Sequence, residues 1–181
     1  MRLFFALPLS AQDVAPLLES QKRMRAVTSR LAPRFVKADQ LHLTLKFLGN
    51  VDRLDELRAA LRQVTAPALE TRFTGLTGFA SPSRARVLVA ELADPDGRLA
   101  ALASTLEEIG TAVGVPRERR PFRPHVTLAR IKHPGNARAL LEAGALEPYA
   151  VRFTELVLFE SQLLASTSRY TPRERCALGA E

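Results

Sequence analysis

The sequence predicts an α+β fold of two pseudo-symmetric lobes, in which antiparallel sheets face a central cleft and helices lie outside. The first observation behind this prediction is a motif, His-x-Thr-Leu, which begins at His42 and again at His125, 83 positions later (125 − 42). The second is an octet, RFTGLTGF at 72–79 and RFTELVLF at 152–159, with five of eight residues identical and an offset of 80 (152 − 72). These similar offsets indicate a duplicated unit. We therefore expect residues 1–181 to form a single bilobal domain with one histidine motif in each repeat.

The first repeat is predicted to contain a strand over 2–9, a helix from Ser10, a strand over 41–48, a helix over 52–64 and a strand over 71–79. Ser10 can cap the first helix with Asp13 as its partner, although Pro16 can shift the start of that helix. The strand over 41–48 alternates apolar and polar residues, which is typical of a half-buried strand. Leucines at spacings of three and four predict the second helix.

The second repeat is predicted to contain a strand over 84–92, a helix from Asp94 to about Gly114, a strand over 120–131, a short helix over 136–144, and strands over 151–159 and 169–178. Asp94 can cap its helix, and Pro95 fits the first helical position. This order repeats that of the first half. Two such units would pack around a pseudo-twofold axis, and each would offer one His-x-Thr strand to the groove between them.

The twin motif suits acid–base chemistry on a phosphate. Residues i and i+2 of a strand point the same way, so His42 and Thr44 share one face, as do His125 and Thr127. A histidine has an ordinary pKa near 6.5, so one imidazole can take a proton while the other gives one. Threonine hydroxyls can hold an anionic phosphoryl centre. A single such motif is most often structural, but two copies at matching places in a repeat point to a site, because duplicated packing alone preserves apolar residues.

The composition limits the classes of protein. With 26 Lys and Arg against 19 Asp and Glu, the net charge is +7, which favours a polyanionic partner such as nucleic acid, although a basic protein without such a partner is an alternative. The single cysteine excludes an internal disulfide and fits a reducing compartment. No apolar run is long enough for a membrane span. We expect a cytoplasmic monomer, and no metal site, because the histidine motifs lack a ligand cluster.

Several segments together resemble the 2H phosphoesterase superfamily, and within it the bacterial 2′-5′ RNA ligase type of RNA 2′,3′-cyclic phosphodiesterase. They are RLFFAL at the start, LHLTLKFLG (41–49), RPFRPHVTLAR (120–130), LFESQL (158–163) and YTP (170–172). The resemblance covers nearly the whole chain and implies a two-lobed enzyme without metal or cofactor. It implies hydrolysis of RNA 2′,3′-cyclic phosphate ends to a 2′-phosphate, and reversible formation of 2′-5′ linkages, with tRNA halves among the expected RNA partners.

The resemblance also implies roles for the motif residues. His42 would protonate the departing 3′ oxygen, His125 would deprotonate water, and Thr44 and Thr127 would hold phosphate oxygens. Nothing in the residues themselves assigns acid and base, so the two histidines can exchange roles.

Two further residues lie five positions after the motif histidines, namely Phe47 and Arg130. Strict alternation puts both off the catalytic face, but a bulge near the strand end can turn them toward the groove. There Phe47 would stack on a terminal base and Arg130 would contact phosphate. The alternative is a core phenylalanine and a surface cation.

A basic stretch over 117–132 holds six Lys or Arg residues against one acid. We expect Arg119, Arg120 and Arg123 within it to contact RNA, although an ordinary loop would look the same. Two other functions stay open. One is an RNA-binding module with decayed catalysis, which the intact motifs disfavour. The other is a 2H enzyme that acts on small cyclic nucleotides, which the basic composition disfavours.

Overall fold

The computed structural model describes residues 1–164 and 168–179. The strands are β1 (Arg2–Pro8), β2 (Arg34–Phe35), β3 (His42–Asn50), β4 (Leu69–Phe79), β5 (Ala85–Leu92), β6 (His125–Gly135), β7 (Tyr149–Phe153), β8 (Glu155–Leu163) and β9 (Ser168–Ala177). The helices are α1 (Ala11–Arg25), α2 (Leu54–Leu61), α3 (Arg98–Ala112) and α4 (Arg138–Ala143), with 3-10 turns η1 (Ala38–Gln40) and η2 (Pro82–Arg84). No helix in this part of the chain is long and apolar enough to cross a membrane.

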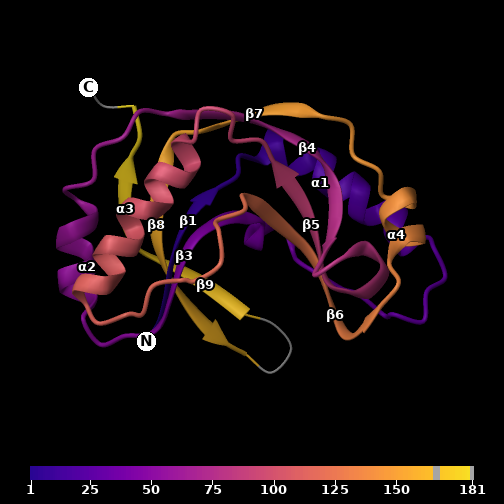
Figure 1. Cartoon of the computed structure of the whole chain (residues 1–181), viewed down its shortest axis with the longest axis horizontal. Coiled ribbons are helices and arrows are strands. Elements are labelled where there is room, and N and C mark those ends of the chain that lie inside the picture. Colours follow the sequence, from indigo (N-terminus) through magenta and orange to yellow (C-terminus); the bar gives the residue numbers. More distant parts are fainter. Residues whose placement is uncertain (165–167, 180–181) are drawn as a thin grey trace.

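The strands form one curled antiparallel sheet in the order β7-β4-β5-β6-β3-β1-β8-β9, with β2 beside β6 (Figure 1). Helices α2 and α3 lie beside one half of the sheet, and α1 and α4 lie beside the other (Figure 1). The predicted α+β fold with antiparallel strands and outer helices is therefore confirmed. The two half-sheets meet where β3 pairs with β6, through the single register pair Leu43 with Val126.

The register of the sheet follows the sequence repeat. Leu43 and Val126 each follow a motif histidine, so equivalent positions of the two repeats pair with one another. The same holds in β4 and β7, where Thr71 pairs with Val151, 80 positions later (151 − 71). A pseudo-twofold axis between the repeats requires such self-equivalent pairs. The two histidines consequently flank this axis on neighbouring strands.

The sequence predicted one strand over 151–159, which includes the second octet, but the structure has two strands there. Residues 151–159 are divided at Thr154 into β7, which pairs with β4, and β8, which pairs with β1 in the other half-sheet. The first octet stays within β4, whose second half pairs with β5. Each octet thus ends beside the opposite repeat. The strand breaks because the chain passes from one half-sheet to the other at this point.

The N-termini of α1 and α3 agree with the sequence prediction in the cap of α1, and differ from it in the effect of Pro16 and in the start of α3. Ser10 caps α1 as predicted, accepting the Asp13 N–H at 3.1 Å. Helix α1 begins directly after it at Ala11 and keeps Pro16 inside, so Pro16 does not shift the start of the helix. Helix α3 begins only at Arg98, which leaves Pro95 in the preceding turn. Asp94 nevertheless accepts the N–H groups of Leu99 and Ala100, at 3.0 and 2.9 Å, from outside the helix.

The core lies between the sheet and its helices. It includes the inward side of β1, the leucines of the two motif strands, and one phenylalanine from each octet (Leu3, Phe5, Leu7, Leu43, Leu45, Phe73, Val126, Leu128, Phe153). Full burial of such a side chain contributes about 1.5–3 kcal/mol. The opposite face of the sheet stays open and carries the polar positions of β3 and β6.

Candidate active site

Strands β3 and β6 present their motif residues alike. In both, the histidine and threonine are half-buried, while the residues after each, Leu43 and Leu45 or Val126 and Leu128, are buried. This alternation places the four motif side chains on the open face of the sheet. The arrangement predicted from the two His-x-Thr sequences is therefore confirmed, and the paired strands bring both motifs to the pseudo-twofold axis.

A backbone carbonyl two residues upstream holds each histidine ring. His42 Nδ1 donates to the Gln40 carbonyl at 2.7 Å, and His125 Nδ1 donates to the Arg123 carbonyl at 2.6 Å. Because a carbonyl can only accept, Nδ1 carries the proton and Nε2 remains for chemistry. His42 Nε2 lies 3.0 Å from the Thr44 hydroxyl oxygen. Sequence reasoning missed these anchors, since a carbonyl is common to every residue type and leaves no signature.

The two imidazoles are poised to be neutral in the unliganded protein. Burial is the main cause that lowers the pKa of His42 to about 4; the Gln40 carbonyl opposes it, and the nearby Arg130 and His125 add smaller lowering effects. Burial also lowers the pKa of His125, with contributions from Arg123 and Arg130. Arg130 thus acts on both rings. A phosphate anion bound between the histidines would raise both pKa values, because an opposite charge favours the protonated form.

A bulge in each motif strand turns the next polar position to the open face. On β3 the register moves from Thr44 opposite Ala6 to Lys46 opposite Phe5, which leaves Leu45 without a partner. On β6 it moves from Thr127 to Ala129 in the same way. Both strands therefore bury two residues in succession, and then expose Phe47 or Arg130. Strict alternation is wrong here, and the bulge places these two side chains on the face of the histidines.

Different groups support the two bulges. The Gln21 side chain, buried in α1, donates to the carbonyls of Val36 at 2.9 Å and of Leu128 at 3.0 Å. On the other strand, the buried Lys46 ammonium pairs with Glu107 at 2.7 Å and donates to the Pro116 carbonyl at 3.1 Å. Lys46 thereby also holds the start of the loop between α3 and β6. Each bulge is tied to a helix rather than to the local strand alone.

An aromatic group surrounds His42. Its ring centroid lies 5.1 Å from that of Phe4 and 5.4 Å from that of Tyr170. Phe4 also contacts Phe47 and Phe159, at centroid distances of 5.9 and 5.4 Å. Phe47 is 58% exposed and forms the outer edge of this group. Only Phe47 was predicted here, because Phe4 and Phe159 belong to apolar stretches that indicate core, and Tyr170 comes from a distant strand of polar sequence.

A cation and an acid accompany His125 instead. Phe79 lies edge-on to its ring at 4.9 Å, and the Arg123 guanidinium lies over Phe79 at 4.5 Å. Arg123 also pairs with Glu91 at 2.7 Å. Phe79 and Phe159 end the two octets, so each histidine has the octet phenylalanine of the opposite repeat beside it. This exchange follows because the end of the first octet pairs with β5 of the second repeat, whereas the end of the second octet pairs with β1 of the first.

The other predicted RNA contacts lie on the exposed loop between α3 and β6. The Arg120 side chain approaches Glu118 at 3.4 Å, and the Arg119 N–H donates to the same carboxylate at 3.0 Å. Of the three arginines predicted to contact RNA, only Arg123 has a charge contact with a motif histidine, and it also lies over the Phe79 ring beside that histidine. The roles of Arg119 and Arg120 stay predictions.

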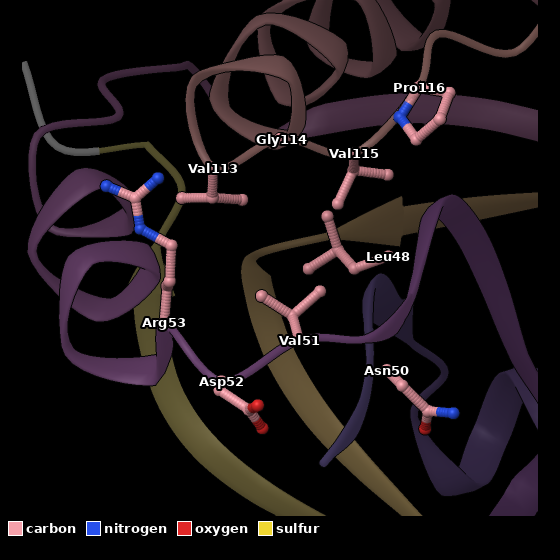
Figure 2. Close-up of a pocket in the computed structure, with 9 residues that line it drawn as sticks. All are labelled: Leu48, Asn50, Val51, Asp52, Arg53, Val113, Gly114, Val115 and Pro116. Carbon is pink, nitrogen blue, oxygen red and sulfur yellow. The ribbon is translucent and has the colours of Figure 1, made fainter.

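A separate hollow of about 260 Å³ lies on the helix side of the sheet, between the end of β3, the start of α2 and the end of α3 (Figure 2). Leu48, Val51, Val113 and Val115 converge on it, and neither histidine lines it (Figure 2). Among residues 1–164 and 168–179, no group of three His, Cys, Asp or Glu side chains is placed to hold a metal.

Comparison with known proteins identifies the family. A profile described as the 2′-5′ RNA ligase superfamily matches residues 16–163. The chain belongs to this superfamily. Its members similar to this chain include the RNA 2′,3′-cyclic phosphodiesterase of Escherichia coli, which is 35% identical over 98% of the chain and 96% of the relative. The enzyme of the same name from Thermus thermophilus is 37% identical over 74% of the chain and 70% of the relative.

Solved structures of the superfamily agree with the fold. The crystal structure of TT0787 from Thermus thermophilus superposes with a TM-score of 0.83 at 28% identity, covering 100% of both chains. The structure of Escherichia coli LigT complexed with 3′-AMP gives a TM-score of 0.73 at 28% identity, over 99% of this chain and 98% of LigT. The 2H phosphoesterase resemblance predicted from the motifs is thus confirmed at the level of sequence and fold.

Proposed function

We propose that this protein hydrolyses the 2′,3′-cyclic phosphate at the end of an RNA chain to a 2′-phosphate. The observation that carries the proposal is the placement of two anchored imidazoles and two threonine hydroxyls around one pseudo-twofold axis. The relatives named RNA 2′,3′-cyclic phosphodiesterase support the reaction. The net charge of +7 supports an anionic substrate.

The proposed step uses one histidine as base and one as acid. His125 Nε2 takes a proton from water as the water oxygen attacks phosphorus. The bond from phosphorus to the 3′ oxygen breaks, and protonated His42 gives its Nε2 proton to that oxygen. The products are a 2′-phosphate and a free 3′ hydroxyl; His125 then releases its proton to solvent and His42 takes one up, which restores the starting state. The pseudo-symmetry of the site also permits the opposite assignment.

Thr44, Thr127 and Arg130 would hold the phosphate oxygens. Arg130 suits this role because it is exposed after the bulge of β6 and its charge lowers the pKa of both histidines. Its guanidinium would offset negative charge that grows in the transition state. Phe47 would stack on the terminal base, as exposed aromatic side chains do in sites for single-stranded RNA.

The finer parts of this proposal concern the cellular setting. We expect tRNA halves among the RNA substrates, reversible joining of 2′-5′ linkages, a monomeric enzyme and a cytoplasmic location. The exposed loop with Arg119, Arg120 and Arg123 would add phosphate contacts along longer RNA.

The decisive experiment is incubation of the purified protein, in excess chelator, with an oligoribonucleotide that ends in a 2′,3′-cyclic phosphate. The phosphate isomer of the product is then identified by NMR. We expect a 2′-phosphate, formed at the same rate with or without chelator. RNA binding without turnover would favour the decayed binding module, and turnover of mononucleotides alone would favour the small cyclic nucleotide enzyme. Loss of activity in chelator, restored by a divalent ion, would contradict the metal-free mechanism.

A further inference from the structure

A second hollow, of about 400 Å³, lies toward the ends of β1, β3 and β8 that are farthest from His42, and is lined by Arg2, Gly49, Asn50, Ser161 and Leu163. Its volume falls within the range of about 300–1,000 Å³ that is common for ligand sites. None of these five residues belongs to the catalytic group described above.

The register places this hollow on the catalytic face. Arg2 lies two residues before Phe4 on β1, so both side chains point the same way, and Phe4 contacts His42. Arg2 pairs with Asn50 on β3. The bulge beside Gly49, whose φ is 73°, brings Asn50 onto this face. Two residues of strand rise put Arg2 about 7 Å beyond Phe4.

Strand β8 completes the hollow from the other side. Phe4 pairs with Phe159, so Ser161 and Leu163 continue the face of Phe159 at alternate positions. The aromatic row of Phe4, Phe47 and Phe159 therefore separates His42 from the hollow. The hollow therefore lies on the open face directly beyond the aromatic row, on the side away from His42.

The chemistry of the lining combines apolar surface with a cation. Leu163 is 71% exposed, which is unusual for a large apolar side chain on the face of a sheet. Arg2 is exposed beside it, and no ion pair of Arg2 occurs among residues 1–164 and 168–179. Asn50 and Ser161 add an amide and a hydroxyl. An apolar side chain can pack against the face of a base, and a cation beside it can contact a backbone phosphate.

The geometry points to a subsite here for the nucleotide on the 5′ side of the terminal one. This inference rests on the proposed function. Because a 2′,3′-cyclic phosphate closes the 3′ end of an RNA chain, the chain continues only through its 5′ phosphate. With the cyclic phosphate at the histidines and the terminal base at Phe47, the next nucleotide extends past the aromatic row. Leu163 contacts its base there, and Arg2 contacts the phosphodiester between the two nucleotides.

Steady-state kinetics with matched substrates test this subsite. A mononucleotide 2′,3′-cyclic phosphate is compared with the dinucleotide that carries the same terminal base and cyclic phosphate. An apolar contact with the base and one phosphate contact should lower KM for the dinucleotide about tenfold, which corresponds to about 1.4 kcal/mol. Arg2→Gln and Leu163→Ser should each remove most of that advantage and leave the mononucleotide KM unchanged. Arg138→Gln, which removes a charge from exposed α4, is the control and should leave both substrates unchanged.

The possible outcomes separate the two proposals. If the wild-type protein hydrolyses neither substrate, the proposed function itself is wrong. If it hydrolyses both with equal KM, or if Arg2→Gln and Leu163→Ser leave the dinucleotide KM unchanged, only the subsite is overturned. Equal losses on both substrates would also overturn it, because they would place Arg2 and Leu163 in the support of the catalytic centre. A tenfold rise in the dinucleotide KM of Arg138→Gln would also overturn the subsite, because the effect of Arg2→Gln would then reflect the net charge of the protein and not a local contact.

Discussion

The two halves of the open face share a backbone and differ in the side chains around each histidine. Both carry a histidine anchored to a carbonyl two residues upstream, a threonine two residues later, and a bulge that exposes the fifth residue after the histidine. Around His42 the neighbours are aromatic, whereas around His125 they include Arg123 and Glu91. The backbone directs the equivalent groups of the two halves alike, and the side chains around them differ. Under the proposed function, the two halves would meet the two unlike parts of a nucleotide, base and phosphate.

Removal of either motif histidine should reduce turnover more than any other substitution in the two halves. His42→Ala and His125→Ala should each lower single-turnover hydrolysis by about 10²–10⁴-fold, the usual contribution of a general acid or base. The double variant should lose much less than the product of the two single losses, because the groups act in one step. Thermal melts check that each variant folds.

Multiplicative losses in the double variant would mean that the two histidines work independently. Near-wild-type turnover in either single variant, with an unchanged melt, would show that the duplicated motif is structural.

Separate substitutions of Arg130 and Phe47 should distinguish phosphate recognition from base recognition. Arg130→Gln should lower kcat about 10²-fold, as loss of one charge-stabilising donor in a site typically does. Phe47→Ala should instead raise KM about tenfold with little change in kcat, since stacking contributes about 1–3 kcal/mol to substrate and transition state alike. The kcat and KM values of both variants on one mononucleotide substrate decide this. The same pattern in the two variants would remove the proposed division between the halves.

Replacement of the side chains that support the two bulges should lower the free energy of unfolding by different amounts. Lys46→Met leaves Glu107 half-buried without its cation, and breaking such a pair costs about 3–5 kcal/mol when both groups are fully buried, so we expect about 3 kcal/mol. Gln21→Leu removes two hydrogen bonds, for about 1–2 kcal/mol, because the Leu128 carbonyl keeps the Val36 N–H at 2.9 Å. Urea unfolding measures both.

Gln21→Leu should also lower kcat several-fold through Arg130, with the effect reduced in an Arg130→Gln background. Equal effects of Gln21→Leu in both backgrounds would restrict Gln21 to a structural role.

The pH dependence should show that the two histidines titrate as a pair. Turnover needs one neutral and one protonated ring. The pKa of His42 is lowered to about 4 and that of His125 is lowered from 6.5, so the singly protonated pair is lost above about 6.5 and below about 4. We expect a bell-shaped kcat/KM with both limbs at or below pH 6.5, since this quantity reports the free enzyme. The kcat profile should lie at higher pH, because bound phosphate raises both pKa values. A kcat/KM that stays constant from pH 6 to 8 would contradict the pairing.

Much of the fold and the central four residues were accessible from the sequence, because they depend on local patterns. Alternation in LHLTLKFL and HVTLAR sets the face of His42 and His125, and Ser10 caps its helix through a neighbour three residues away. The repeat is directly recognisable in the sequence from the two His-x-Thr-Leu motifs and the two similar octets. The start of α3 was missed because Asp94 reaches past a turn to cap the helix from outside, which no spacing rule anticipates.

The sequence by itself determined the duplicated unit, the paired His-x-Thr faces and the basic charge. Only the tertiary structure decided which strands neighbour one another, and hence that Phe159 comes to His42 and Phe79 to His125. It also decided the bulges that turn Phe47 and Arg130 to the open face, and the contact of Gln21 with the Leu128 carbonyl. The physical reason is range: alternation follows from the geometry of one strand, whereas the register and bulges of the two motif strands depend on partners 34 or more residues away (42 − 8 and 125 − 91).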